Sequence, residues 1–299
     1  MPTPPAPSHY ILRPTVPEIP LVCDSPHSGV EYPDDFDHVV PRATLRSAED
    51  THVEALWEGL PGVGATLIAA RFPRSYIDPN RKLEDIDPQL LATPWPDRLE
   101  PSEKSRLGAG LIWSTVGKGT PIYDRKLSVA EVRHRIDHCY RPYHDALAAA
   151  IERTHARFGA VWHLNLHSMP DNAYERLGLG SGRQLADFVL GDRDGTTCEP
   201  VFIDLVEREL RARGYSVARN DPFKGVELIG QIGRPALRRN SLQIEIRRPL
   251  YMDERTRERN AGFRSVQADL AEVARAMALY LADAATAGSQ ERRGTTQRD

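Results

Sequence analysis

Two histidines come just after apolar segments, at positions where strands are expected to end. His27 stands shortly after the apolar residues 19–23, and His167 comes directly after the apolar segment 160–166. Where the sheet is mainly parallel, residues at such strand ends line the functional crevice. Two imidazoles and one carboxylate are a common ligand set for a catalytic zinc ion, whose fourth position stays open for water. The two histidines therefore predict a zinc site. The alternative is that each is a hydrogen-bonded, partly buried histidine.

A carboxylate that could complete this site stands near the start of a helix expected over residues 43–60. Glu49 and Asp50 are both candidates. An acidic side chain in the first turn of a helix is stabilised by the helix dipole and can face a crevice. The alternative is that the two residues only cap the helix, and their positions alone leave both interpretations open.

A cluster of cationic and amide side chains follows the second expected strand, residues 65–72. Arg74, Asn80 and Arg81 fall within eight positions of one another. The guanidinium fork matches the geometry of a carboxylate, so this cluster is typical of a site for an anionic substrate. The alternative is a surface ion pair between Asp78 and Arg81, which would stabilise the protein little.

Glu245 lies between Ile244 and Ile246 in a segment expected to be a strand. Alternation in a strand places its side chain on the face opposite the two isoleucines. Because burial of an unpaired carboxylate is unfavourable, this position needs an explanation. Glu245 either pairs with Arg247 on the same face or serves as a general base with a raised pKa near a metal-bound water.

Strand-like and helix-like segments alternate along the chain and would position these residues. A Ser128–Glu131 capping box opens a long helix that Pro142 should break or kink. The alternation predicts an α/β protein, a three-layer α/β/α sandwich around a mostly parallel mixed sheet. Strands are expected at 19–23, 65–72, 160–166, 188–190, 215–218 and 242–246, and helices at 43–60, 128–158, 200–213 and 255–285.

The 299 residues suit a single α/β domain. Seven prolines occur in the first twenty residues, and prolines favour extended chain. We therefore expect a Pro-rich arm over residues 1–20, one domain over 21–287 and a polar tail over 288–299. Three widely spaced cysteines fit neither a disulfide framework nor a cysteine-based zinc cluster.

Charge and hydropathy exclude several classes of protein. A net charge of −3 argues against a strongly basic protein that binds nucleic acid or an anionic membrane. No apolar run of membrane-spanning length occurs, and the N-terminal residues do not resemble a secretory signal. We expect a cytoplasmic protein with no nucleic-acid or membrane partner. The oligomeric state is left open.

The sequence resembles the N-formylglutamate amidohydrolase family, which is related to the zinc carboxypeptidases and to aspartoacylase-type amidohydrolases. The resemblance covers residues 21–254 and rests on short motifs in a fixed order. These are Pro26-His27-Ser28-Gly29, Asp50-Thr-His-Val, Arg74 with Asp78-Pro-Asn80-Arg81, Gly119-Thr-Pro-Ile-Tyr123, Arg141-Pro-Tyr-His144, Asn165-Leu-His167-Ser168-Met169, Gln243-Ile-Glu245 and Leu250-Tyr-Met-Asp253.

This resemblance implies a phosphorylase/hydrolase-like fold, as in the zinc carboxypeptidases. It implies a metal-dependent amidohydrolase with one zinc per chain and a small anionic N-acyl amino acid as substrate. The implied reaction is hydrolysis of the formamide of N-formyl-L-glutamate to formate and L-glutamate. The alternatives are a carboxypeptidase-like enzyme, another N-acyl-amino-acid deacylase, or a metal-free binding module on the same scaffold.

The resemblance implies His27, Asp50 and His167 as the zinc ligands. The related carboxypeptidases take their first two ligands from a His-x-x-Glu motif, but here the third residue after His27 is Val30. The carboxylate ligand must therefore come from elsewhere. Asp50 occupies the position of the family's acidic residue, and its neighbour Glu49 remains a possible substitute.

The resemblance also implies the other roles in the site. Glu245 corresponds to the carboxylate that activates the water, and Arg74 to the arginine that stabilises the developing oxyanion. Asn80 and Arg81 match the pair that holds a substrate carboxylate. His144 could also reach the site, and the glycine-rich residues 178–182 are expected to form a flexible loop over the crevice rather than a dinucleotide site.

Overall fold

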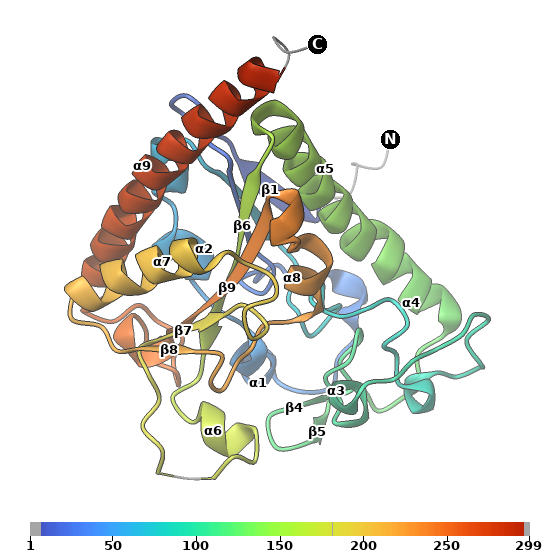
Figure 1. Ribbon diagram of the computed structural model, residues 1–299. Coiled ribbons are helices and arrows are strands. Elements are labelled where there is room, and N and C mark those ends of the chain that lie inside the picture. The colour runs from blue at the N-terminus through green and yellow to red at the C-terminus, as the bar shows by residue number, and fades with distance from the viewer. Residues whose placement is uncertain (1–6, 181, 296–299) are drawn as a thin grey trace. The chain divides into compact units, whose positions relative to one another are not determined.

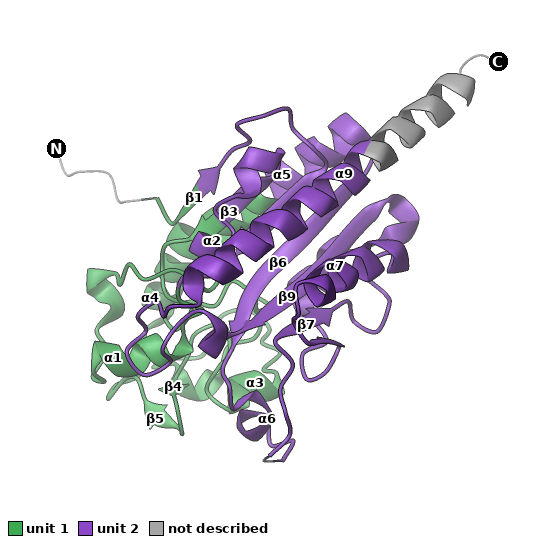
Figure 2. Ribbon diagram, turned by 90° about the vertical axis from the view of Figure 1, so that its left-hand side faces the viewer, with its two compact units in different colours: residues 1–10, 26–51, 69–147 green, residues 11–25, 52–68, 148–299 purple. Residues whose placement is uncertain are grey.

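The computed structural model describes residues 7–180 and 182–295, with side chains as far as residue 282 (Figure 1). Parts of the expected arm and tail, residues 1–6 and 296–299, lie outside the described residues, as does residue 181 of the glycine-rich segment. The chain forms two compact units (Figure 2). Of the described residues, unit 1 comprises 7–10, 26–51 and 69–147, and unit 2 comprises 11–25, 52–68, 148–180 and 182–295.

A seven-stranded mixed sheet with helices on both sides forms the centre of the fold, which confirms the expected α/β class (Figure 1). The strand order is β1-β3-β2-β6-β9-β7-β8. Strands β2, β6 and β9 run parallel, whereas β7 is antiparallel to β9 and parallel to β8. The strands are β1 His9–Leu12, β2 Leu21–Ser25, β3 Thr66–Ala70, β6 Val161–Met169, β7 Phe188–Gly191, β8 Val217–Arg219 and β9 Arg239–Arg247.

One face of the sheet in unit 2 is apolar. Alternate residues of the central strands, such as Leu164 in β6 and Ile244 in β9, join a core cluster with three helices. These helices are α2 Val53–Leu56, α7 Pro200–Ala212 and α9 Phe263–Thr295. Because side chains alternate across a strand, the intervening residues must point to the other face.

The other face of the same strands is polar and buried. In β6 it carries His163, Asn165 and His167, and in β9 it carries Gln243 and Glu245; all five are at most 7% exposed. The parallel register sets His167 directly beside Glu245. Buried polar groups are tolerated only when they are paired, so this face must contain a connected hydrogen-bond network.

The helix expected over residues 43–60 is interrupted, and that prediction is wrong. The segment forms α1 Arg42–Leu45, the 3-10 turns η2 Arg46–Ala48 and η3 Leu60–Val63, and the short helix α2. Asp50 lies in the gap, where its backbone N–H donates to the His27 carbonyl at 2.9 Å instead of to a helical neighbour. His52 has a φ of 72° in the left-handed region, which also breaks the helix.

The expected helix over residues 128–158 forms, and a π-helical turn stands just before Pro142. The Ser128–Glu131 capping box opens α4 Val129–Arg135. A π-helical turn, η5 Ile136–Tyr140, then leads into α5 Arg141–Phe158. Proline lacks an N–H and crowds the carbonyl four residues before it, so a widened turn at this point accommodates Pro142.

The C-terminal helix is α9, and the elements not yet described are short. The expected C-terminal helix begins at Phe263 rather than at residue 255, because the Asp253 carboxylate accepts the N–H groups of Arg255 and Thr256 in a turn. No helix among the described residues is long and apolar enough to cross a membrane. The other elements are α3 Glu103–Arg106, α6 Ala173–Arg176, α8 Glu227–Ile232, the hairpin β4 Thr115–Val116 with β5 Thr120–Pro121, and the 3-10 turns Asp34–Phe36, Pro88–Leu90, Pro235–Leu237 and Arg248–Leu250.

Candidate active site

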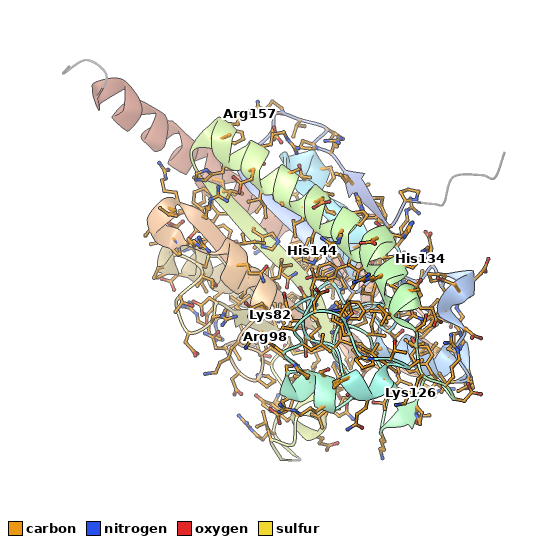
Figure 3. The ribbon with its side chains drawn as sticks, turned by 90° about the vertical axis from the view of Figure 1, so that its right-hand side faces the viewer. Lys82, Arg98, Lys126, His134, His144 and Arg157 are labelled. Atoms are coloured by element: carbon orange, nitrogen blue, oxygen red, sulfur yellow. The ribbon has the colours of Figure 1, made fainter. Side chains whose placement is uncertain are left out.

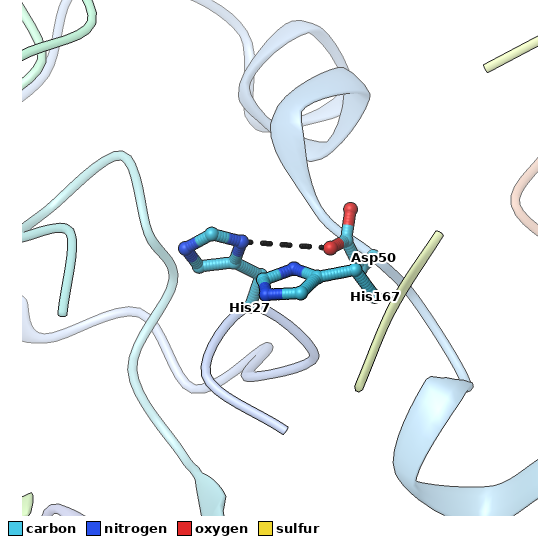
Figure 4. Close-up of side chains that lie close together, drawn as sticks. All are labelled: His27, Asp50 and His167. Carbon is cyan, nitrogen blue, oxygen red and sulfur yellow. Dashed lines mark ion pairs between the residues drawn. The ribbon is translucent and has the colours of Figure 1, made fainter. Parts of the chain in front are cut away.

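Three buried side chains with metal-binding atoms come together in the structure. His27, Asp50 and His167 each offer one ligand atom, and these atoms all lie within 4.8 Å of one another (Figure 4). His27 Nδ1 is 3.5 Å from Asp50 Oδ2. Among the described residues, no other group of histidine, cysteine or acidic side chains meets the same criterion. Two imidazoles and a carboxylate could hold a metal ion.

His27 is fixed by close backbone packing and by a buried carboxylate. A Cβ atom at Gly29 would lie 2.2 Å from the Phe72 carbonyl oxygen, so only glycine allows this approach of the two segments. His27 Nε2 donates to Asp78 Oδ1 at 2.7 Å. A carboxylate only accepts, so the proton resides on Nε2 and the lone pair on Nδ1, the nitrogen that faces Asp50.

Asp78 is fully buried and receives several donors. Its carboxylate accepts from Arg74 Nη2 at 2.9 Å, from Trp113 Nε1 at 3.2 Å and from the Asn80 backbone N–H at 2.9 Å. Burial alone would raise the pKa of Asp78, but the positive charges of Arg74 and Arg81 and the hydrogen bond from His27 hold that pKa well below its usual range. Asp78 therefore remains ionised. Its ion pair is with Arg74 and is buried, unlike the surface pair with Arg81 considered from the sequence.

Arg74 is oriented by this carboxylate and by an aromatic ring. Both Nε and Nη2 donate to Asp78 Oδ2, and the guanidinium carbon lies 5.0 Å from the centroid of the Trp113 ring. The Arg74 side chain is 16% exposed. Nη1 makes no hydrogen bond to the described residues and can donate to a ligand.

The segment that carries Asn80 and Arg81 is held by the π-helical turn and by α5. The Tyr140 hydroxyl donates to the Arg81 carbonyl, and His144 Nε2 donates to the Pro79 carbonyl, both at 2.8 Å. The two rings lie 4.1 Å apart (centroid to centroid), and His144 projects from α5 (Figure 3). His144, whose part in the site was left open by the sequence, thus contacts the backbone of this segment.

The Arg81 guanidinium is itself anchored by backbone groups. Nε donates to the Ala109 carbonyl at 2.9 Å, and Nη1 donates to the Asn80 carbonyl at 3.1 Å. Burial lowers the pKa of Arg81, and the charge of Arg74 lowers it further. Arg81 is therefore a rigidly held cation whose remaining donors can meet a carboxylate.

Glu49, the alternative carboxylate ligand, is engaged elsewhere. Its carboxylate accepts from the Tyr32 hydroxyl at 2.6 Å, from Thr51 Oγ1 at 3.0 Å and from Arg46 Nε at 3.2 Å. The structure brings Asp50, and not Glu49, together with the two histidines.

A buried hydrogen-bond chain in unit 2 fixes His167. Its Nε2 donates to Asn165 Oδ1 at 2.7 Å, and Asn165 Nδ2 donates to Asp24 Oδ1 at 2.8 Å. His163 Nε2 also meets Asp24 Oδ1, at 2.9 Å, while its Nδ1 contacts Ser241 Oγ at 2.8 Å. Because Asp24 only accepts when ionised, the chain orients the Asn165 amide and leaves the lone pair of His167 on Nδ1.

The sequence analysis missed Asp24, His163 and Asn165. The pattern that could have identified His163 and Asn165 is the alternation of polar residues at 163, 165 and 167 in an otherwise apolar strand. Such a row on one face of a central strand indicates a buried polar network.

Glu245 belongs to the same polar face. Its Oε1 accepts from Gln243 Nε2 at 2.8 Å. Arg247, its alternative partner, instead forms an ion pair with Asp187 at 3.0 Å. The backbone register places Glu245 opposite His167 on the neighbouring strand. Glu245 is thus a buried carboxylate on the same face as His167, without the ion pair to Arg247.

A family model for N-formylglutamate amidohydrolase matches residues 19–252 of the chain. An N-formylglutamate deformylase of Pseudomonas aeruginosa is 30% identical over 278 residues, which cover 92% of this chain and 95% of that protein. The chain belongs to the N-formylglutamate amidohydrolase family. This confirms the resemblance inferred from the sequence motifs.

Other relatives of the family agree with this membership. An N-formylglutamate deformylase of Pseudomonas putida is 28% identical over 240 residues, covering 79% of this chain and 83% of that one. The crystal structure of an N-formylglutamate amidohydrolase from Ralstonia eutropha is 66% identical, covers 93% of this chain and 99% of its own, and superposes with a TM-score of 0.91. A protein of known structure from Agrobacterium tumefaciens, 18% identical with a TM-score of 0.62 over 95% of this chain and 97% of its own, shares the fold.

Proposed function

We propose that the protein is a zinc-dependent amidohydrolase that hydrolyses the formamide bond of N-formyl-L-glutamate to formate and L-glutamate. The observation that carries the proposal is the buried His27–Asp50–His167 group in a chain of this family. The relatives named N-formylglutamate deformylase support the choice of substrate.

His27, Asp50 and His167 would hold the zinc ion. The hydrogen bonds from His27 to Asp78 and from His167 to Asn165 place the ring proton on Nε2, so that Nδ1 carries the lone pair that a metal requires. When bound, zinc lowers the pKa of water to about 7 and polarises a carbonyl oxygen. Neutral nitrogens with a single carboxylate make the donor set that catalytic zinc sites use.

Glu245 acts as the general base and acid. It accepts a proton from the attacking water and then delivers that proton to the leaving nitrogen, so that formate and a free amine result. Arg74 stabilises the negative charge that develops on the formyl oxygen when water attacks the formyl carbon. Its orientation by Asp78 and Trp113 supports this role because a preorganised donor is already in place.

Asn80 and Arg81 bind a carboxylate of the substrate. Their segment is braced by Tyr140 and His144, which supports a role in precise positioning. Binding the carboxylate sets the formyl carbon within reach of the water and of Glu245, and such positioning supplies a large part of the rate enhancement in many enzymes.

The test is formate release from N-formyl-L-glutamate, with N-acetyl-L-glutamate as the matched substrate. We expect formate and L-glutamate in equal amounts, and much slower release of acetate. Glu245→Gln should lose about 10²–10⁴-fold in kcat while retaining zinc. Comparable rates on both substrates would favour the broader N-acyl-amino-acid deacylase, and no release from either would contradict the proposal.

A further inference from the structure

A third cation stands beside Arg74 and Arg81. Lys104 is the second residue of α3 Glu103–Arg106. Its carbonyl accepts the Ala109 N–H at 2.8 Å, and the Ala109 carbonyl accepts Arg81 Nε at 2.9 Å. Two successive hydrogen bonds therefore tie the backbone of Lys104 to the guanidinium of Arg81.

The helix that carries Lys104 is fixed on its other side as well. Asp85 Oδ1 accepts the Ser102 N–H at 2.7 Å, and Asp85 Oδ2 accepts the Ser102 hydroxyl at 2.9 Å. The Ser102 side chain in turn caps α3 by accepting from the Ser105 N–H. Lys104 thus projects from a braced turn and yet remains an exposed residue, accessible to a ligand.

The charges around Lys104 repel it. Partial burial and the positive charges of Arg81 and Arg74 lower the pKa of its ammonium, and the opposing contribution comes from the adjacent Glu103. No ion pair joins Lys104 to a carboxylate of the residues that the structure describes. Clustered like charges are unfavourable, and a bound anion would relieve that repulsion.

The two buried carboxylates near these cations, Asp78 and Asp85, already accept hydrogen bonds. Asp78 accepts from His27, Arg74 and Trp113, and Asp85 accepts from Ser102. Glu103, the residue before Lys104, offsets part of the repulsion among the three cations. Because Asp78 and Asp85 already accept hydrogen bonds, Arg81 and Lys104 together can bind a ligand with two negative charges better than a ligand with one.

We propose that Lys104 is a specificity-determining residue that binds the side-chain carboxylate of a dicarboxylic N-acyl amino acid, while Asn80 and Arg81 bind the other carboxylate. This inference rests on the proposed function, since N-formyl-L-glutamate carries two carboxylates and Asn80 and Arg81 account for one. A lysine suits the second because its compact charge on a flexible stem can follow a flexible substrate side chain.

The experiment compares N-formyl-L-glutamate with N-formyl-L-glutamine, which has the same shape but a neutral side chain. In Lys104→Gln we expect KM for the glutamate substrate to rise about 10- to 100-fold, the factor for a lost hydrogen bond between charged groups. Kinetics on the glutamine substrate should be unchanged, so the preference of the wild type for the charged substrate disappears. Lys104→Arg should retain most of that preference. An equal loss on both substrates would overturn the proposal.

Two controls separate this inference from the proposed function. Lys118→Gln alters an exposed lysine of the same unit, between β4 and β5, and should leave both substrates unaffected. Titration calorimetry with L-glutamate and with L-glutamine measures the affinity for each ligand without any turnover. If the wild type releases no formate, the proposed function fails, while the calorimetry still tests Lys104. Equal affinity of wild type and Lys104→Gln for L-glutamate would refute the role of Lys104.

Discussion

At the scale of single residues, each histidine of the His27–Asp50–His167 group is oriented through its Nε2 atom. Asp78 accepts from His27, and Asn165, held by Asp24, accepts from His167. Such partners select the tautomer and raise the basicity of the ligating nitrogen. The side-chain types of His27, Asp50 and His167 could be recognised in the sequence. Their partners could not, because pairing between distant strands and loops creates these hydrogen bonds.

Asn165→Ala should weaken zinc binding about 10- to 100-fold, since His167 loses the acceptor that fixes its tautomer. The measurement is competition between the metal-free protein and a chromophoric chelator, which reads affinity without turnover. Ser241→Ala is the matched control, because Ser241 contacts His163 and not His167. Unchanged zinc affinity in Asn165→Ala would remove this residue from the positioning of His167.

At the scale of elements, apolar segments correctly predicted the strands that carry the site, and the capping box correctly predicted the start of α4. The continuous helix over residues 43–60 was wrong, because the long-range hydrogen bond from Asp50 to the His27 carbonyl competes with local helical bonding. Local sequence patterns contain no information about that competition. Because the expected helix is interrupted at this point, Asp50 lies outside any helix and close to His27 and His167.

The α4 capping box gives a pH-dependent prediction. The hydrogen bond from Arg125 to Glu131 lowers the pKa of that carboxyl to about 2. A carboxyl with a depressed folded-state pKa contributes stability above its unfolded pKa, near 4.5, and loses that contribution as the pH falls toward 2. Glu131→Gln should therefore be less stable than the wild type at pH 7, and the gap should narrow below about pH 4.5.

Urea unfolding between pH 7 and pH 3 measures this effect. Ser128→Ala serves as the control, since removal of the hydroxyl acceptor should reduce the free energy of unfolding by about 1 kcal/mol without the same pH dependence. A gap between Glu131→Gln and the wild type that stays constant over this range would show that the charge of Glu131 contributes nothing.

At the scale of the whole molecule, the alternation of strand-like and helix-like segments was sufficient to predict an α/β fold, and the order of motifs was sufficient to predict the family. The sequence and structural similarity to these relatives covers more than nine tenths of the chain. What could not be predicted is that one face of the central strands is polar and buried, from Asp24 through His163 and Asn165 to Gln243. A single sequence shows each polar residue separately, and only the register of β2, β6 and β9 joins them.

The central claim is that formamide hydrolysis depends on one zinc held by His27, Asp50 and His167. The most direct test is zinc titration of the metal-free protein with formate release from N-formyl-L-glutamate as the readout. We predict that activity is absent before the titration and reaches a plateau at one zinc per chain. The Glu49→Gln variant should behave like the wild type in this titration. The Asp50→Asn variant should neither retain zinc nor recover activity. Full activity of the metal-free protein, or equal recovery in Asp50→Asn, would contradict the account.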